Sequence, residues 1–466
     1  MGKSEITFYA AAFLFLGIVF GSFSISFFWV IIPFLFALGW FRYVNHTIDK
    51  KVSILFLSAA LLGVFYYHGF AVFEERREIL PQNDEVFFGV VVGESKILEK
   101  TQIVPLKLLP PHRGQVTIFT TPLADFSYGE QLEIRGAVKN SLWPDENILS
   151  FPGIRKKGMS EGSLRQALIN NKESWLRNFK ILFSSHEATL LGGLTFGARG
   201  DFSEELRETM RRSGTTHIVA LSGYNISILI WALERLLRSR FSRRFFFWLT
   251  MSLIGAFVLM VGAEASVTRA AIMGALILIA TETGRFYSFR HAVLFAALGM
   301  SLWDPSLVRY DLGFQLSFLS LLGIALFEPI LRRVLWGDEK KGSFLSWREN
   351  LSATISAQVA VLPVLALNFG VFSLTSILAN VLILWAIPFI MALGFVTALL
   401  SLVHISLGFI LQPLLHLALS YMLFIINGTA LMSPVDLLWN GWLTLGYYIV
   451  LILIIFKYTD YEEISS

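Results

Sequence analysis

A group of polar residues interrupts an apolar stretch of the chain, HIVALSGYNISILI, at residues 217–230. His217 and Ser222 are the residue types of a catalytic base and a nucleophile. Five residues do not place them on one helical face, however, the stretch lacks a G-x-S-x-G turn, and no acidic partner is evident. Polar groups in hydrocarbon need partners inside the protein. They therefore either join helices, with Gly223 allowing close approach and Ser222 and Asn225 hydrogen-bonding, or line a path.

The remaining sequence contains no local motif for metal, phosphate or nucleophile chemistry. No two of the eight histidines are closer than 12 positions, which excludes H-x-H and H-E-x-x-H motifs, and there is no cysteine. The glycines between Gly192 and Gly200 are not followed by the G-K-[ST] of a phosphate loop. The sequence therefore predicts a protein that is not an enzyme and that holds no metal and no cofactor.

Ionisable residues inside apolar stretches mark either a pathway or a structural pair. Arg269 lies about one helical turn inside its stretch and needs a partner, for which Asp311 is suited, while Glu264 is placed to cap an N-terminus. The structural and the path-lining interpretations both stay open. The residues expected to line or brace a polar path are His217, Ser222, Gly223, Asn225, Glu264, Arg269, Asp311, Gln315, Ser317, Gln358 and Asn380.

The composition is that of a membrane protein. Of the 466 residues, 55% are hydrophobic and 15% are charged, the mean hydropathy is +0.62, and residues 351–435 contain no Asp, Glu, Lys or Arg. A soluble protein of this length cannot hide so much apolar surface. The sequence predicts a polytopic α-helical membrane protein with twelve or thirteen transmembrane helices. The expected spans are residues 6–24, 27–41, 52–73, 217–237, 245–262, 265–281, 290–303, 311–331, 351–369, 373–403 (one broken helix or two), 405–432 and 435–456.

Residues 74–160 differ in composition from the rest of the chain. They are polar, with short β-type runs and turn residues, and predict a small inserted all-β, OB-like domain of four or five strands. In GEQLEIRGAV, alternation places Leu132, Ile134 and Gly136 on one side of a strand. Residues 74–146 carry 12 acidic and 8 basic side chains, so this domain is a poor electrostatic match for DNA.

Basic residues follow the β-rich runs and are the better electrostatic candidates for DNA contact. Arg155 to Lys157 are interpreted as a basic linker, and the stretch 155–180 holds seven basic and two acidic residues. The DNA-contact candidates are Arg155, Lys156, Lys157, Arg165, Lys172, Arg177 and Lys180.

Residues 161–216 predict amphipathic helices suited to a membrane surface. The last of them can begin at Asp201 or Ser203 as N-cap and end at Gly214. The expected domains are a three-helix membrane segment at 1–73, the β-rich domain at 74–160, the surface helices at 161–216, a membrane domain at 217–457 and a polar tail at 458–466.

RRSGTTHIVALSGYNISIL strongly resembles the signature of the ComEC competence family, the bacterial inner-membrane channel for DNA uptake in natural transformation. SVTRAAIMG, DPSLVRYDLGFQLSFLSLLGI and LPVLALNFGVFSLTSILANVLILWAIP follow in the family's order, so the resemblance covers about residues 185–430. Two differences stand out. The usual SGLH core of the signature is Ser222-Gly223-Tyr224-Asn225 here, and the sequence resembles a short form without the C-terminal metallo-β-lactamase-like domain of many members.

The resemblance implies passage of single-stranded DNA into the cytoplasm. A transporter or membrane scaffold for another polymer or small molecule, built on the same fold, is the alternative. The implied partners are membrane lipid, a DNA receptor, a separate nuclease, and a cytoplasmic translocase or single-strand-binding protein. A homo-oligomer is a further expectation.

Basic residues occur in every second predicted loop up to residue 350, which places those loops in the cytoplasm and the β-rich domain outside the membrane. We expect cysteines introduced by Asp125→Cys and Ser242→Cys to react oppositely with a membrane-impermeant thiol reagent applied to intact cells. Asp125→Cys should label without lysis and Ser242→Cys only after it. The reverse pattern would show that the topology is inverted.

Overall fold

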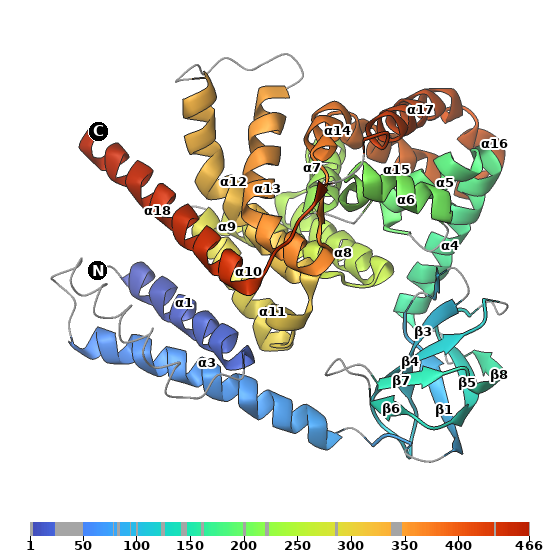
Figure 1. The fold of residues 1–466 in the computed structure, drawn as a ribbon. Helices are drawn as coiled ribbons and strands as arrows, with labels where there is room; N and C mark the ends of the chain where they lie inside the picture. The colour runs from blue at the N-terminus through green and yellow to red at the C-terminus, as the bar shows by residue number, and fades with distance from the viewer. Residues whose placement is uncertain are drawn as a thin grey trace. The chain divides into compact units, whose positions relative to one another are not determined.

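The computed structural model describes most of the chain (Figure 1). The described residues are 3–23, 50–77, 79–81, 84–93, 95–98, 101–122, 126–140, 147–159, 163–198, 202–219, 223–284, 288–336, 347–432 and 435–465. The chain divides into two compact units, which we call the first unit (Met1–Glu173 and Leu233–Leu312) and the second unit (Ser174–Ala232 and Gly313–Ser466). The expected span at 27–41 lies outside the described residues.

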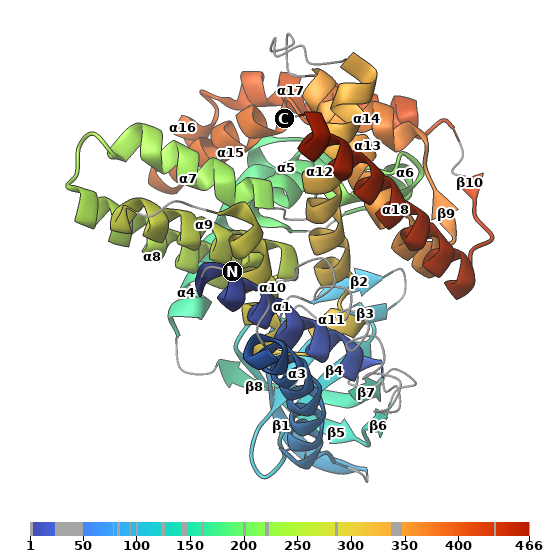
Figure 2. The same cartoon turned by 90° about the vertical axis from the view of Figure 1, so that its left-hand side faces the viewer.

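The first unit contains long apolar helices from two separate parts of the sequence. Its helices are α1 (Lys3–Ser22), α3 (Lys50–Arg77), α8 (Arg243–Val261), α9 (Ala265–Thr283), α10 (Phe289–Trp303) and the short α11 (Leu307–Tyr310). Figures 1 and 2 both show α1 lying along α3.

Small residues bring α1 and α3 into close contact. A Cβ added to Gly63 would lie 2.3 Å from a backbone carbonyl oxygen of α1, and one added to Gly17 would lie 2.0 Å from the Ala60 carbonyl oxygen. Beside this crossing, the rings of Phe13 and Phe56 stack with centroids 5.3 Å apart. Helices in lipid commonly associate through small residues that let their backbones approach closely, because no hydrophobic driving force brings the helices together there.

The β-rich domain also belongs to the first unit. Its strands are β1 (Glu85–Val91), β2 (Lys96–Leu98), β3 (Thr101–Leu108), β4 (Gln115–Thr120), β5 (Glu130–Gly136), β6 (Lys139–Asn140), β7 (Asn147–Ser150) and β8 (Gly153–Met159). They form one sheet in the order β6-β7-β4-β3-β1-β5-β8, with β2 paired to β3. All pairings are antiparallel except β4 with β7.

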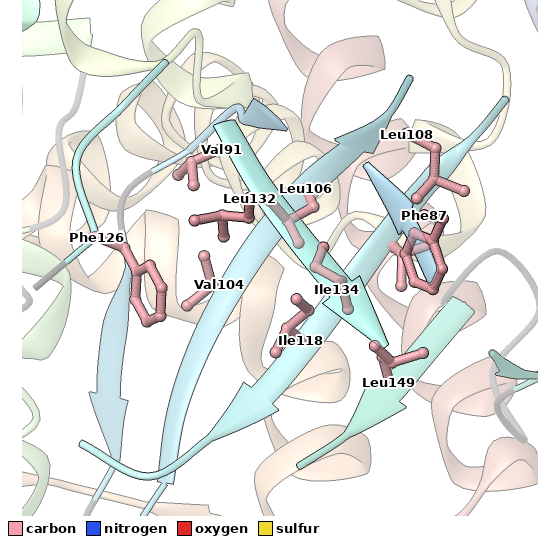
Figure 3. Packing of buried hydrophobic residues seen from close by; sticks show 11 residues of the cluster. Phe87, Val91, Val104, Leu106, Leu108, Ile118, Phe126, Leu132, Ile134 and Leu149 are labelled. Atoms are coloured by element: carbon pink, nitrogen blue, oxygen red, sulfur yellow. The ribbon is translucent and has the colours of Figure 1, made fainter. Parts of the chain in front are cut away.

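The core of this domain is built from alternating side chains of the strands (Figure 3). Leu132 and Ile134 are fully buried, which confirms the alternation expected for β5, whereas Gly136 is partly exposed. Burial also alternates along β3. The alternation is what a sheet with one face against a core requires.

The interpretation of Arg155 to Lys157 as a linker is wrong, because these residues form part of β8. This strand pairs with β5 at the edge of the sheet, and Leu132 lies opposite Lys156. Nearly every residue of β8 is exposed, so the strand has no apolar side. The period-two pattern that reveals a half-buried strand is therefore missing from its sequence.

The second unit is almost entirely helical. It contains α5 (Ser185–Phe196), α6 (Glu204–Arg212), the 3-10 turn η1 (Thr216–Ile218), most of α12 (Leu312–Trp336), α13 (Trp347–Phe369), α14 (Thr375–Ile383), α15 (Ile387–Val403), α16 (Ile405–Gly408), α17 (Gln412–Thr429), α18 (Gly441–Ser465), and the paired strands β9 (Val371–Phe372) and β10 (Val435–Asp436). Two helices, α4 (Leu164–Leu182) and α7 (Gly223–Leu237), run from one unit into the other.

The expectation of surface helices over 161–216 is wrong for α5, which is buried from Glu187 to Phe196. Its glycines admit neighbouring side chains: a Cβ added to Gly192 would lie 2.7 Å from Leu176, and one added to Gly193 would lie 3.0 Å from Phe202. A helix that is apolar all round belongs in a core. The helix α6 also buries its apolar face within the second unit, through Leu206 and Met210.

Within the described residues, six helices are long and apolar enough to cross a membrane: α1, α3, α8, α9, α12 and α13. A seventh span results if α14 and α15, bent by 54° at their junction, count as one. This confirms a multi-pass helical membrane protein. The described residues give fewer spans than the twelve or thirteen expected for the whole chain, of which the span at 27–41 lies outside them. The expected span 217–237, for example, contains only the 15-residue α7, and α10 is equally short. Hydropathy alone does not show where the helix within an apolar stretch begins and ends.

We expect Gly63→Ala to destabilise the protein by about 1–3 kcal/mol, because the new methyl group must displace the α1 backbone. Gly69→Ala is a matched control on the same helix, since a Cβ added there meets nothing within 4 Å. The control should be neutral or stabilising by about 0.5–1 kcal/mol through helix propensity. Thermal unfolding of the purified protein measures both, and equal stabilities would contradict the close crossing.

Candidate functional site

The segment that leads into the polar stretch is shaped by the two ends of α6. Ser203 is the N-cap, and its hydroxyl accepts a hydrogen bond from the Leu206 amide at 3.2 Å. At the other end, Gly214 adopts the left-handed conformation with φ of 68°, and the next amide, that of Thr215, donates to the Met210 carbonyl at 2.9 Å. The expectation that Gly214 ends this helix is confirmed, because glycine adopts this conformation without strain.

The turn after α6 packs against the segment that opens α14. The Ser373 hydroxyl donates to the Arg212 carbonyl at 2.9 Å. A Cβ added to Gly214 would lie 2.5 Å from the Ser376 Cβ, so no side chain fits there. The buried hydroxyls of Ser213 and Thr215 bond to each other at 2.7 Å. Two segments about 160 positions apart thus meet through hydroxyls and bare backbone.

A line of polar side chains extends from this contact along α13 and α14. The Gln358 amide donates to the Ser376 hydroxyl at 2.6 Å. Ser376 and Asn380 are four residues apart on α14 and share its face. The His217 ring lies beside the Asn380 side chain and the Gly214 backbone. Three of the predicted lining residues, His217, Gln358 and Asn380, therefore belong to one cluster.

Asn225 joins α7 to the end of α5. Its side-chain amide donates to the Leu194 carbonyl at 2.9 Å, and Asn225 itself is 5% exposed. The carbonyls of a helix's last turn lack partners within the helix. Here the backbone amides of Gly197 and Ala198 donate hydrogen bonds to the carbonyls of Gly193 and Gly192, and the Asn225 side chain donates to the Leu194 carbonyl. This supports the helix-joining interpretation for Asn225.

The other predicted lining residues occupy different places. Glu264 is the N-cap residue of α9 but makes no side-chain cap hydrogen bond, and Arg269 lies half-buried in the second turn of that helix. Asp311 separates α11 from α12. These three belong to the first unit, whereas Gln315 and the buried Ser317, near the start of α12, belong to the second. Gly223 begins α7, and Ser222 lies outside the described residues.

The structure separates the seven DNA-contact candidates by their surroundings. Lys156 pairs with Glu130 at 3.0 Å and Lys157 with Glu133 at 2.8 Å. The hydrogen bond and charge of Lys157 hold the pKa of Glu133 below its ordinary value. Lys172 is only 2% exposed, so it presents no ammonium group to a phosphate in this conformation. Arg165 lies 4.9 Å over the Tyr128 ring, while Arg155, Arg177 and Lys180 are exposed.

A buried carboxylate that the sequence analysis did not single out lies in the second unit. Glu187 is hydrogen-bonded by the Ser184 amide and hydroxyl at 3.2 and 2.8 Å and by the Ser420 hydroxyl at 3.1 Å, and it pairs with His416 at 2.6 Å. Burial alone would raise the pKa of Glu187, but these bonds and the histidine lower it. The capping-box spacing of Ser184 and Glu187 was the available sequence signal.

Arg309 was also missed by sequence reasoning. Its guanidinium donates to the Ser22 carbonyl at the end of α1 and lies over the rings of Phe23 and Tyr310, at 5.7 and 5.3 Å. A cation at the C-terminus of a helix is favoured by the helix dipole. This contact fastens α1 to the α11 region within the first unit.

We expect Gly214→Ala to destabilise the protein more than Gly370→Ala. Both glycines have φ near 67°, which costs an alanine about 1–2 kcal/mol. Only at Gly214 does the added methyl group also collide with Ser376, which adds about 1–3 kcal/mol, because a Cβ at Gly370 meets nothing within 4 Å. Unfolding of the two purified variants measures the difference. Equal losses of stability would show that the close contact between Gly214 and Ser376 does not contribute to it.

The comparisons with known proteins agree with the resemblance found in the sequence. The family described as "Competence protein" matches residues 194–460. ComE operon protein 3 of Bacillus subtilis (strain 168) is 26% identical over 201 residues, which cover 43% of this chain and 24% of that protein. The match thus spans about a quarter of that relative's length. No solved structure matches the chain. The family match extends over more than half of the sequence and includes the whole signature sequence at residues 211–229, which we call the signature loop. The chain therefore belongs to the Competence protein family.

Proposed function

We propose that this protein passes single-stranded DNA through the bacterial cytoplasmic membrane during natural transformation. The observation that carries the proposal is the family match over residues 194–460, which includes the signature loop and the polar cluster around it. The name of the relative, ComE operon protein 3, fits the same role. The proposal places the β-rich domain outside the membrane, as the alternation of basic loops favours.

A strand crossing a membrane needs a polar, hydrated lining with cationic or stacking groups. Arg269 is the strongest choice for such a group, because it is an arginine within a candidate membrane span that remains partly exposed. His217, Gln315, Ser317, Gln358 and Asn380 are the polar residues that we propose to brace or line the same route. Asn225 acts by holding α7 to α5.

The salt bridges of Lys156 and Lys157 weaken further the electrostatic case for DNA binding by the β-rich domain, which has more acidic than basic residues over 74–146. We propose the exposed side chains of Arg155, Arg177 and Lys180 as the basic groups that contact a phosphate. Strand degradation is assigned to a separate polypeptide, and a DNA receptor and a cytoplasmic translocase or single-strand-binding protein are the other proposed partners. A transporter or scaffold for another polymer is the competing function.

We expect Arg269→Ala to lower DNA uptake at least tenfold while the protein still inserts into the membrane. The measurement is internalised labelled DNA in a deletion strain complemented with each variant, alongside the amount of protein in the membrane fraction. Arg244→Ala is the control, because this arginine is exposed at the start of α8. Wild-type uptake by Arg269→Ala would remove this residue from the path, and wild-type uptake by the deletion strain itself would refute the proposed function.

A further inference from the structure

Pro363 interrupts the hydrogen bonds of α13, one of the helices long and apolar enough to cross a membrane. Proline has no amide hydrogen, so the carbonyl four residues earlier, that of Val359, loses its donor within the helix. The proline ring also clashes with the carbonyl at that position, which kinks a helix. A carbonyl freed in this way in an apolar environment needs a donor from another part of the protein.

Two neighbouring tyrosines of α18 supply donors at this point. The Tyr447 hydroxyl donates to the Val359 carbonyl at 2.8 Å, and the Tyr448 hydroxyl donates to the next carbonyl, that of Ala360, at 3.0 Å. The Tyr447 ring makes T-shaped contacts with the rings of Trp439 and Tyr448, at centroid distances of 5.9 and 6.0 Å. A hydroxyl on a ring that its neighbours support thus takes the place of the missing helical donor.

These hydroxyls matter for the attachment of α18, because much of this helix is exposed. Leu445, Ile449 and Val450 are between 50% and 57% exposed, and a Cβ added to Gly446 would meet nothing within 4 Å. Lipid chains are as apolar as such side chains, so no hydrophobic force holds α18 against α13 in a membrane. Hydrogen bonds between the two helices therefore contribute strongly to their association.

The chain that leads into α18 is attached on the other side of Pro363. The strand β10 precedes α18 and pairs with β9, which follows α13. Beside this pair, the Leu437 amide donates to the Gly370 carbonyl at 2.8 Å. The tyrosines thus bond to α13 before Pro363, and β10 bonds to the chain after it. Together, β10 and α18 connect the two arms of the proline bend.

The bend determines where the partners of the signature loop lie. Gln358 comes before Pro363, whereas Ser373 and Ser376 follow β9, and the Gln358 amide donates to the Ser376 hydroxyl across the bend at 2.6 Å. The Ser373 hydroxyl donates to the Arg212 carbonyl of the signature loop at 2.9 Å. A change in the angle at Pro363 would move Ser373 and Ser376 relative to Gln358.

We propose that α18 is a strap that holds α13 bent at Pro363 and so keeps Ser373 and Ser376 against the signature loop. Loss of the two tyrosine hydrogen bonds lets α13 straighten and withdraws these serines from the loop. The inference goes beyond the proposed function, since the shape of α13 is measured without DNA. Its failure would leave the proposed function untouched.

The first test is a double-mutant cycle on thermal unfolding of the purified full chain in lipid nanodiscs. Tyr447→Phe keeps the ring and removes the hydroxyl, so it should lower the unfolding temperature by roughly 2–4 °C. In a Pro363→Ala background the backbone amide at position 363 again serves the Val359 carbonyl, and Tyr447→Phe should have less than half of this effect. Tyr421→Phe is the matched control. Its hydroxyl donates to the Leu382 carbonyl of α14 at 2.9 Å, so its loss should have the same effect in both backgrounds.

The second test measures the bend directly. The chain has no cysteine, so Glu349→Cys and Leu367→Cys, both at exposed positions of α13, place nitroxide labels on either side of Pro363. A straight helix separates these positions by about 27 Å. We expect pulsed electron paramagnetic resonance to give a shorter distance in the otherwise wild-type chain than in Pro363→Ala. Combining Tyr447→Phe with Tyr448→Phe should broaden the distribution towards the longer distance.

Equal effects of Tyr447→Phe in the two backgrounds would overturn the proposal, because the hydroxyl would then not replace the donor that proline lacks. An unchanged label distance in the double tyrosine variant would overturn it as well, because α18 would then not hold the bend. If Pro363→Ala fails to fold, the label distances with and without the two tyrosine hydroxyls decide the question alone.

Discussion

The arrangement around the signature loop depends on the missing side chain at Gly214. The chain turns there in the left-handed conformation, and the bare backbone fits against Ser373 and Ser376 with no room for a methyl group. This contact fixes where the next residues lie, because the turn from α6 into η1 follows within four positions. His217 is thereby placed beside Asn380, and the polar line through Gln358 begins at the same point.

A second constraint is the need to satisfy backbone groups in an apolar interior. The helix α5 is buried along almost its whole length, so its two ends require partners from the protein. Glu187 and Ser184 close the N-terminal end as a capping box, reinforced by His416 and Ser420 of α17. Asn225 closes the C-terminal end at Leu194. Polar residues in apolar sequence thus serve here first as connections between helices.

This distinction matters for the proposed function. Asn225 donates to the Leu194 carbonyl, Gln358 donates to the Ser376 hydroxyl and Asn380 lies beside the His217 ring, whereas Arg269 lies partly exposed within a candidate span. In the β-rich domain, Lys156 and Lys157 form salt bridges, whereas Arg155 of that domain and Arg177 and Lys180 of α4 are exposed.

The sequence by itself determined the features that depend on neighbouring residues. Apolar runs located α1, α3, α8, α9, α12 and α13, alternation located β5, and the glycine after a short capped helix located the end of α6. The family signature was equally readable, since it is a contiguous motif.

Tertiary structure alone decided the rest. The strand β8 lacks alternation because it forms an exposed edge, and α5 is buried because α15 and α17 cover it. Lys172 is buried although it lies in a basic stretch. The Glu187–His416 pair and the Gly214–Ser376 contact join residues more than 150 positions apart, and no local pattern records which distant segment will supply a partner.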